Sequence, residues 1–107
     1  MDYGFLLNLG KVPLDQFTLE HKGIRFLAEY VPPPTESGSR AEYVRARSGI
    51  SKEGFEYKST LPVLPNNTYV LRSININRSD VLVAFRVVRI EGDASIVLTP
   101  KFTDRRE

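Results

Sequence analysis

Residues 81–90, which read VLVAFRVVRI, carry apolar side chains at both odd and even positions. Such a pattern is typical of a central strand that is covered on both faces. The four valines and the isoleucine favour a strand because β-branched side chains lose rotamer freedom in a helix. The alternative is a helix that Asp80 caps and Gly92 ends, with Arg86 and Arg89 on its polar side. We predict the strand.

The same kind of alternation recurs along the chain. Residues 24–31 place Ile, Phe, Ala and Tyr on one face and therefore predict a strand. Further strands are predicted over residues 41–49, 54–60, 68–76 and 95–102. Clusters of Gly, Pro, Asn, Asp and Ser separate these segments. About seven short strands without a long helical period between them predict an all-β fold, namely an antiparallel β-sandwich, with a small β-barrel as the alternative.

One stretch adds support for a sandwich. Residues 64–74, LPNNTYVLRSI, resemble the run before the penultimate strand of fibronectin type III and related immunoglobulin-like sandwiches, where a tyrosine hydroxyl ties a corner of the chain. The resemblance covers about a tenth of the chain. It implies that Tyr69 is the corner residue.

Two segments lack a single clear pattern. Residues 12–23 fit either a short helix or a strand that pairs with residues 24–31 through the turn HKG. Residues 31–40, VPPPTESGSR, combine three prolines, which favour a polyproline II conformation, with a small polar tip that favours mobility. We predict that this second segment is a loop between two strands.

Length and composition fit an ordinary globular domain. A chain of 107 residues with 41% hydrophobic and 26% charged residues is large enough for one core, so we predict a single domain over residues 1–107. The domain is either a whole protein or one module of a longer chain. The longest apolar run, Val81–Phe85, is far shorter than the ~20 residues of a membrane-spanning helix, so no span is expected. Because the chain has no cysteine, its compartment stays open.

The sequence lacks the usual components of a catalytic or metal site. Its one histidine, His21, lies in a predicted turn. No set of His, Cys or carboxylate residues has metal-binding spacing, and the glycines do not form a phosphate-binding loop. We therefore expect no enzyme activity, no metal and no cofactor.

Positive charge is concentrated in the middle of the chain, where residues 40–90 hold nine bases against four acids. On the strand predicted at 41–49, Tyr43, Arg45 and Arg47 share one face. An aromatic ring beside two guanidinium groups is typical of surfaces that stack on bases or pair with phosphate. The plainer interpretation is a solvated sheet face with cross-strand ion pairs. The candidate binding site also includes two other bases of this segment, Lys58 and Arg72.

These patterns predict a non-catalytic accessory or interaction domain whose partner is another protein or a neighbouring domain of the same chain. The alternative function is binding of a polyanion or nucleic acid through the Tyr/Arg sheet face. Arg86 and Arg89 lie on opposite faces of one predicted strand, so they cannot both belong to one binding surface. We expect Arg86 to have a structural role.

Overall fold

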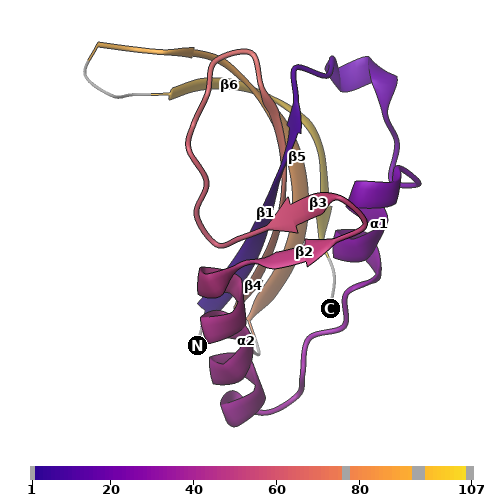
Figure 1. Ribbon diagram of the computed structural model, residues 1–107, viewed down its shortest axis with the longest axis vertical. Coiled ribbons are helices and arrows are strands. Elements are labelled where there is room, and N and C mark those ends of the chain that lie inside the picture. Colours follow the sequence, from indigo (N-terminus) through magenta and orange to yellow (C-terminus); the bar gives the residue numbers. More distant parts are fainter. Residues whose placement is uncertain (1, 76–77, 93–95, 106–107) are drawn as a thin grey trace.

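The computed structural model describes residues 2–75, 78–92 and 96–105 and shows a mixed α/β domain (Figure 1). In chain order its elements are β1 (Asp2–Gly10), a 3-10 turn η1 (Leu14–Gln16), α1 (Lys22–Glu29), α2 (Glu36–Ser48), β2 (Ile50–Lys52), β3 (Phe55–Tyr57), β4 (Thr68–Asn75), β5 (Ser79–Ile90) and β6 (Ile96–Arg105). One antiparallel sheet has the strand order β1-β4-β5-β6, and β2 and β3 form a separate hairpin.

The all-β prediction is therefore wrong. Two helices replace predicted strands, so the fold is not an immunoglobulin-like or fibronectin-like sandwich of about seven strands. The β-barrel alternative is also wrong, because the described sheet is open, with β1 at one edge and β6 at the other. The strands predicted at 68–76, 81–90 and 95–102 are confirmed as β4, β5 and β6, and the one at 54–60 as the shorter β3.

Helix α1 replaces the strand predicted at 24–31. The apolar residues of that segment fit the period of a helix as well as the alternation of a strand. Ile24 and Leu27 lie one turn apart on a helix, and both are fully buried. The turn HKG is the start of this helix, where the Nδ1 atom of His21 accepts a hydrogen bond of 3.0 Å from the backbone N–H of Gly23. The two alternatives for residues 12–23 are replaced by η1 and a connection that leads to α1.

Helix α2 overturns both the strand predicted at 41–49 and the mobile loop tip before it. Its signals are local: Thr35 caps the N–H of Gly38 at 3.1 Å, and Gly49, with φ of 94°, ends the helix. The residues that α2 buries are the small Ser39 and Ala46, so the helix lacks the strong apolar stripe that reveals most helices. No helix in the described ranges has the length and apolar character needed to cross a membrane.

The core lies on one side of the four-stranded sheet, which we call the inner face. The inner face carries alternate side chains of three strands: Tyr3, Phe5, Leu7, Val70, Ile74, Leu82 and Ala84. They pack against Ile24 and Leu27 of α1, Ala46 of α2 and Tyr57 of β3. In Figure 1 the β2–β3 hairpin lies in front of the sheet, with α1 to its right and α2 below, and the paired ends of β5 and β6 project at the upper left.

Candidate functional site

Three of the predicted site residues lie on α2, so the Tyr/Arg sheet face does not exist. Tyr43 and Arg47 are neighbours one helical turn apart, and the Arg47 guanidinium lies 5.9 Å from the centre of the Tyr43 ring. Arg45 pairs with Glu42 at 3.2 Å. These contacts within one helix leave Arg45 and Arg47 exposed on the helix surface.

The other two predicted site residues lie elsewhere. Lys58 exchanges two backbone hydrogen bonds with Leu6 of β1, at 2.8 and 3.1 Å, and its side chain is half-buried. Arg72 lies on the inner face of β4 with 2% of its surface exposed. The structure therefore brings Tyr43, Arg45 and Arg47 together but places Lys58 and Arg72 apart from them.

Arg72 is fully paired inside the core. Its Nε and Nη2 atoms donate hydrogen bonds to the two carboxylate oxygens of Asp80 at 2.5 and 2.6 Å. Its Nη1 atom donates to the carbonyl oxygen of Leu27 at 2.6 Å, at the end of α1. The guanidinium also lies 5.6 Å from the centre of the Tyr30 ring. Since a ligand would have to displace these partners, Arg72 serves to fasten α1 to the sheet.

A chain of phenol groups continues from this ion pair toward α2. The hydroxyls of Tyr3 and Tyr30 share a hydrogen bond of 2.9 Å, and Tyr30 donates to Glu42 at 2.7 Å. Burial raises the pKa of Tyr3, and burial together with the hydrogen bonds to Tyr3 and Glu42 raises the pKa of Tyr30. Both phenols thus stay neutral at ordinary pH, and their contacts position the helices.

A third tyrosine gives a prediction at alkaline pH. The buried Tyr57 hydroxyl donates to the carbonyl oxygen of Gly23 at 2.6 Å, and burial, with the nearby charge of Glu53, raises the pKa of Tyr57 to about 12. Because the folded pKa is above the ordinary 10.0, the neutral phenol stabilises the fold fully below pH 10.0 and loses this effect as pH rises through about 12.

Tyrosinate absorbance followed against pH should therefore show a step near pH 12 that loses the amplitude of one tyrosine in Tyr57→Phe, while Tyr3 and Tyr30 still titrate above pH 10.0. Circular dichroism recorded on the same samples will show whether unfolding accompanies that step. If the wild type completes its titration near pH 10.0 while still folded, Tyr57 is not buried as the structure places it.

The side of the sheet opposite the core, which we call the outer face, is the most extended candidate for a binding surface. Its described positions on β1, β4 and β5 are Asp2, Gly4, Leu6, Asn8, Tyr69, Leu71, Ser73, Asn75, Ser79, Val81, Val83 and Phe85. The register places Leu6 beside Leu71 and Leu71 beside Val83, which makes an apolar row across three strands. All three side chains are half-buried, whereas their inner-face neighbours are buried.

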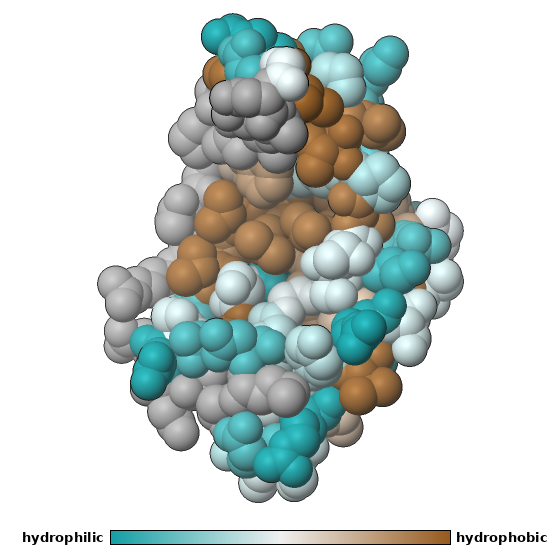
Figure 2. All heavy atoms as spheres, turned by 90° about the vertical axis from the view of Figure 1, so that its left-hand side faces the viewer, coloured by the Kyte–Doolittle hydropathy of each residue, from teal (hydrophilic) through white to brown (hydrophobic). Residues whose placement is uncertain are grey.

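A loop borders one end of the outer face. Tyr69 holds it, because its hydroxyl donates to the carbonyl oxygen of Pro62 at 2.7 Å and accepts from the N–H of Leu64 at 2.9 Å. The prediction that Tyr69 ties a corner is thus confirmed, although in a different fold. The loop exposes Val63 and Leu64. Figure 2 shows apolar side chains gathered across the middle of this side of the molecule, with polar side chains below them.

Sequence reasoning did not identify the outer face as a site, although β5 carried its signal. The two apolar faces of VLVAFRVVRI predict a strand covered on both sides. In the described residues, the helices and the β2–β3 hairpin cover the inner face only. The apolar residues at the outer positions of β5 are therefore the signal from which the outer face could have been predicted as a site.

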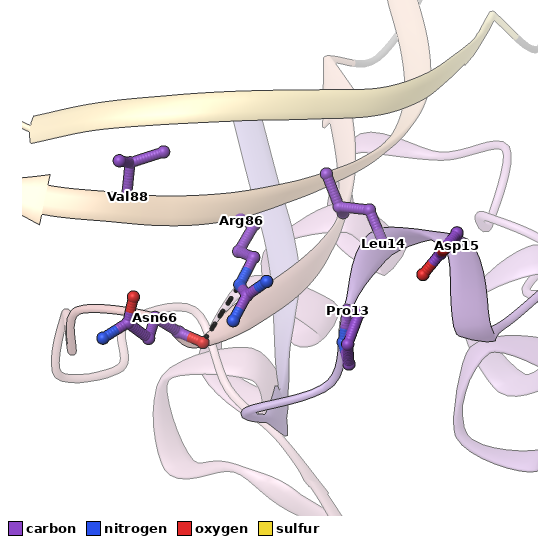
Figure 3. Close-up of a pocket in the computed structure, with 6 residues that line it drawn as sticks. All are labelled: Pro13, Leu14, Asp15, Asn66, Arg86 and Val88. Atoms are coloured by element: carbon purple, nitrogen blue, oxygen red, sulfur yellow. Dashed lines mark hydrogen bonds between the residues drawn. The ribbon is translucent and has the colours of Figure 1, made fainter.

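The pocket in Figure 3 is a second candidate, a hollow of about 450 Å³ between η1 and β5. Its lining residues are Pro13, Leu14, Asp15, Asn66, Arg86 and Val88. The Nε atom of Arg86 donates to the carbonyl oxygen of Asn66 at 3.3 Å, which agrees with the structural role predicted for Arg86. Arg89, in contrast, forms an exposed ion pair with Glu91. The exposed Asp15, Asn66 and Val88 make this hollow an open part of the surface.

The part of the chain that the structure describes contains no cluster of three or more His, Cys, Asp or Glu residues able to hold a metal ion. His21 uses Nδ1 as the cap of α1, and its ring packs edge-on against Phe55 at 5.6 Å. No family model, curated protein or solved structure matches the chain, so the outer face is the observation from which function is argued.

Proposed function

We propose that the protein is a non-catalytic interaction domain that binds another protein chain through the outer face of its sheet. One observation carries the proposal: beyond the buried Tyr69, which the loop at 62–64 contacts, the described chain leaves Val81 and Val83 on the second apolar face of β5 partly exposed. An antiparallel sheet that keeps one face in water normally alternates apolar and polar residues. Val81, Val83 and Phe85 instead place three apolar side chains on the open side.

The charge of the outer face indicates the chemistry of the partner. Of its described positions on β1, β4 and β5, only Asp2, at the start of β1, carries a charge, and the centre of the face is uncharged. Binding to a polyanion depends on clustered Lys and Arg side chains that reach phosphate groups. The predicted arginines do not form such a cluster, because Arg45 pairs with Glu42 and Arg72 is buried. An apolar protein surface therefore suits this face better than nucleic acid does.

The free energy available from the face is modest. Covering the exposed part of a Leu or Val side chain on this face removes at most roughly 50 Å² of apolar surface from water, which contributes about 1 kcal/mol. Leu6, Leu71 and Val83 together then contribute about 3 kcal/mol, less than the cost of association. A partner must therefore also contact the loop that exposes Val63 and Leu64.

A photo-crosslinking experiment tests this proposal. We expect p-benzoylphenylalanine in place of Phe85, on the outer face, to crosslink to a protein in cells of the source organism. The matched control carries the same probe in place of Val44, which is exposed on α2. The partner, identified by mass spectrometry and purified, should bind the wild type in solution and bind the variant Val83→Lys at least tenfold more weakly.

The probe at position 85 also separates the two functions weighed from the sequence. Crosslinks that nuclease treatment removes would support the polyanion alternative and contradict the proposal. Equal protein crosslinking from positions 85 and 44 would contradict it as well, because the outer face would then have no preference.

A further inference from the structure

We infer that the partner of the outer face is a second copy of this chain, so that two sheets pack face to face around a two-fold axis. This inference rests on the proposed function and adds the identity of the partner. Three features support it: the absence of charge at the centre of the face, where Asp2 at the start of β1 is the one charged described position on β1, β4 and β5, the geometry of sheet packing, and the protection of both sheet edges.

The charge pattern permits the face to meet itself. In a two-fold interface the same patch occurs on both partners, so charges of one sign near its centre would repel. The apolar row Leu6, Leu71 and Val83 and its neighbours Ser73 and Asn8 are uncharged. In β6 the register partner of Val81 is Arg105, which places that base at the edge strand of the sheet.

Sheet geometry also favours a second copy. Two sheets pack face to face about 10 Å apart with their strands rotated by about 30°, an angle that arises from the twist of each sheet. Two copies of this sheet have the same twist because the chains are identical. The packing would supply a second layer for β5 and would bury Val81 and Val83, as a strand with two apolar faces requires.

Association through the sheet edges is disfavoured in comparison. The edge strand β6 contains Pro100, which has no N–H to donate, followed by Lys101, and both residue types are typical of protected edges. At the other edge, β1 already pairs at Leu6 with the backbone of Lys58. The outer face is therefore the better route to a dimer.

The area predicts how stable the dimer is. Four strands at a spacing of about 4.8 Å and a length of about seven residues give a flat area of roughly 440 Å². A standard interface covers about 800 Å² per partner, so the exposed Val63 and Leu64 of the bordering loop must contribute. We expect a reversible dimer whose population rises with concentration.

Sedimentation equilibrium and light scattering over a series from micromolar to millimolar concentration test the inference. The average mass of the wild type should rise from 12.1 kDa toward twice that value. Val83→Lys places a charge at the centre of the face and should weaken association at least tenfold. The same substitution at Val44, on α2, is the matched control and should leave the mass unchanged.

A second variant keeps the inference testable if Val83→Lys fails to fold. Ser73→Arg adds a charge to the outer face at an exposed position and removes no apolar contact, so it should fold and remain a monomer. A wild type that stays at 12.1 kDa throughout, or a dimer that persists in Ser73→Arg, would overturn the inference. Neither result contradicts the proposed function, which the crosslinks from positions 85 and 44 test separately.

Discussion

Asp80→Asn should lower the free energy of unfolding by about 3–5 kcal/mol, the largest effect expected from a single polar change in this protein. The change keeps the shape of the side chain but removes its charge, which leaves the Arg72 guanidinium unpaired. Since Arg72 is only 2% exposed, water cannot replace the lost carboxylate. Chemical denaturation followed by circular dichroism measures the loss.

Replacing the arginine of this ion pair should lower the free energy of unfolding by less. Arg72→Met leaves Asp80 without a partner, but the Asp80 side chain is 15% exposed and reaches water. Methionine also fills much of the space between Phe5 and Leu82, the register neighbours of Arg72. We therefore expect Asp80→Asn to be the more harmful of the two changes.

An exposed ion pair provides the control. Arg89 and Glu91 lie 2.6 Å apart, about as close as Arg72 and Asp80, but the Arg89 side chain is 62% exposed. Glu91→Gln should therefore change the free energy of unfolding by less than about 1 kcal/mol. Losses of equal size in Asp80→Asn and Glu91→Gln would show that burial does not distinguish the two pairs.

Leu7→Ala and Leu6→Ala should differ sharply in stability, although the two residues are adjacent and the chemical change is the same. Leu7 lies in the core with almost no exposed surface, so its truncation leaves a cavity and costs about 2–5 kcal/mol. Leu6 points to the outer face and is half-buried, so its truncation costs about 1 kcal/mol in the monomer. Denaturation at low protein concentration measures both values.

Protein concentration adds a second comparison. If two outer faces pack together, the cost of Leu6→Ala should grow as the concentration rises, while that of Leu7→Ala stays the same. Equal costs at low concentration would contradict the assignment of the inner and outer faces, because both leucines would then be equally buried.

The sequence alone predicted three long strands and one tertiary contact correctly. Residues 68–76, 81–90 and 95–102 are rich in β-branched side chains, whose preference for extended backbone is local. The contact of the Tyr69 hydroxyl with the loop before β4 also follows from a local pattern, because it spans only five to seven residues. Such features need no knowledge of what lies across the fold.

Local sequence patterns predicted the wrong secondary structure where the residues fitted both a helix and a strand, or where a helix had no clear apolar face. Ile24 and Leu27 fit a helix, while Ile24, Phe26 and Ala28 fit a strand, and only packing against the sheet selects the helix. In α2 the buried residues are too small to mark a face. Residues 2–10 were not recognised as a strand, although Tyr3, Phe5 and Leu7 alternate with less buried neighbours.

The candidate sites divide in the same way. The sequence by itself determined that β5 has two apolar faces. Only the tertiary structure decided that Arg72 is buried, because its environment depends on the register that sets it between Phe5 and Leu82 and on Asp80 from the next strand. It also decided that α1 and α2 cover one face and leave Leu6, Leu71 and Val83 open, since coverage depends on contacts between segments distant in the chain.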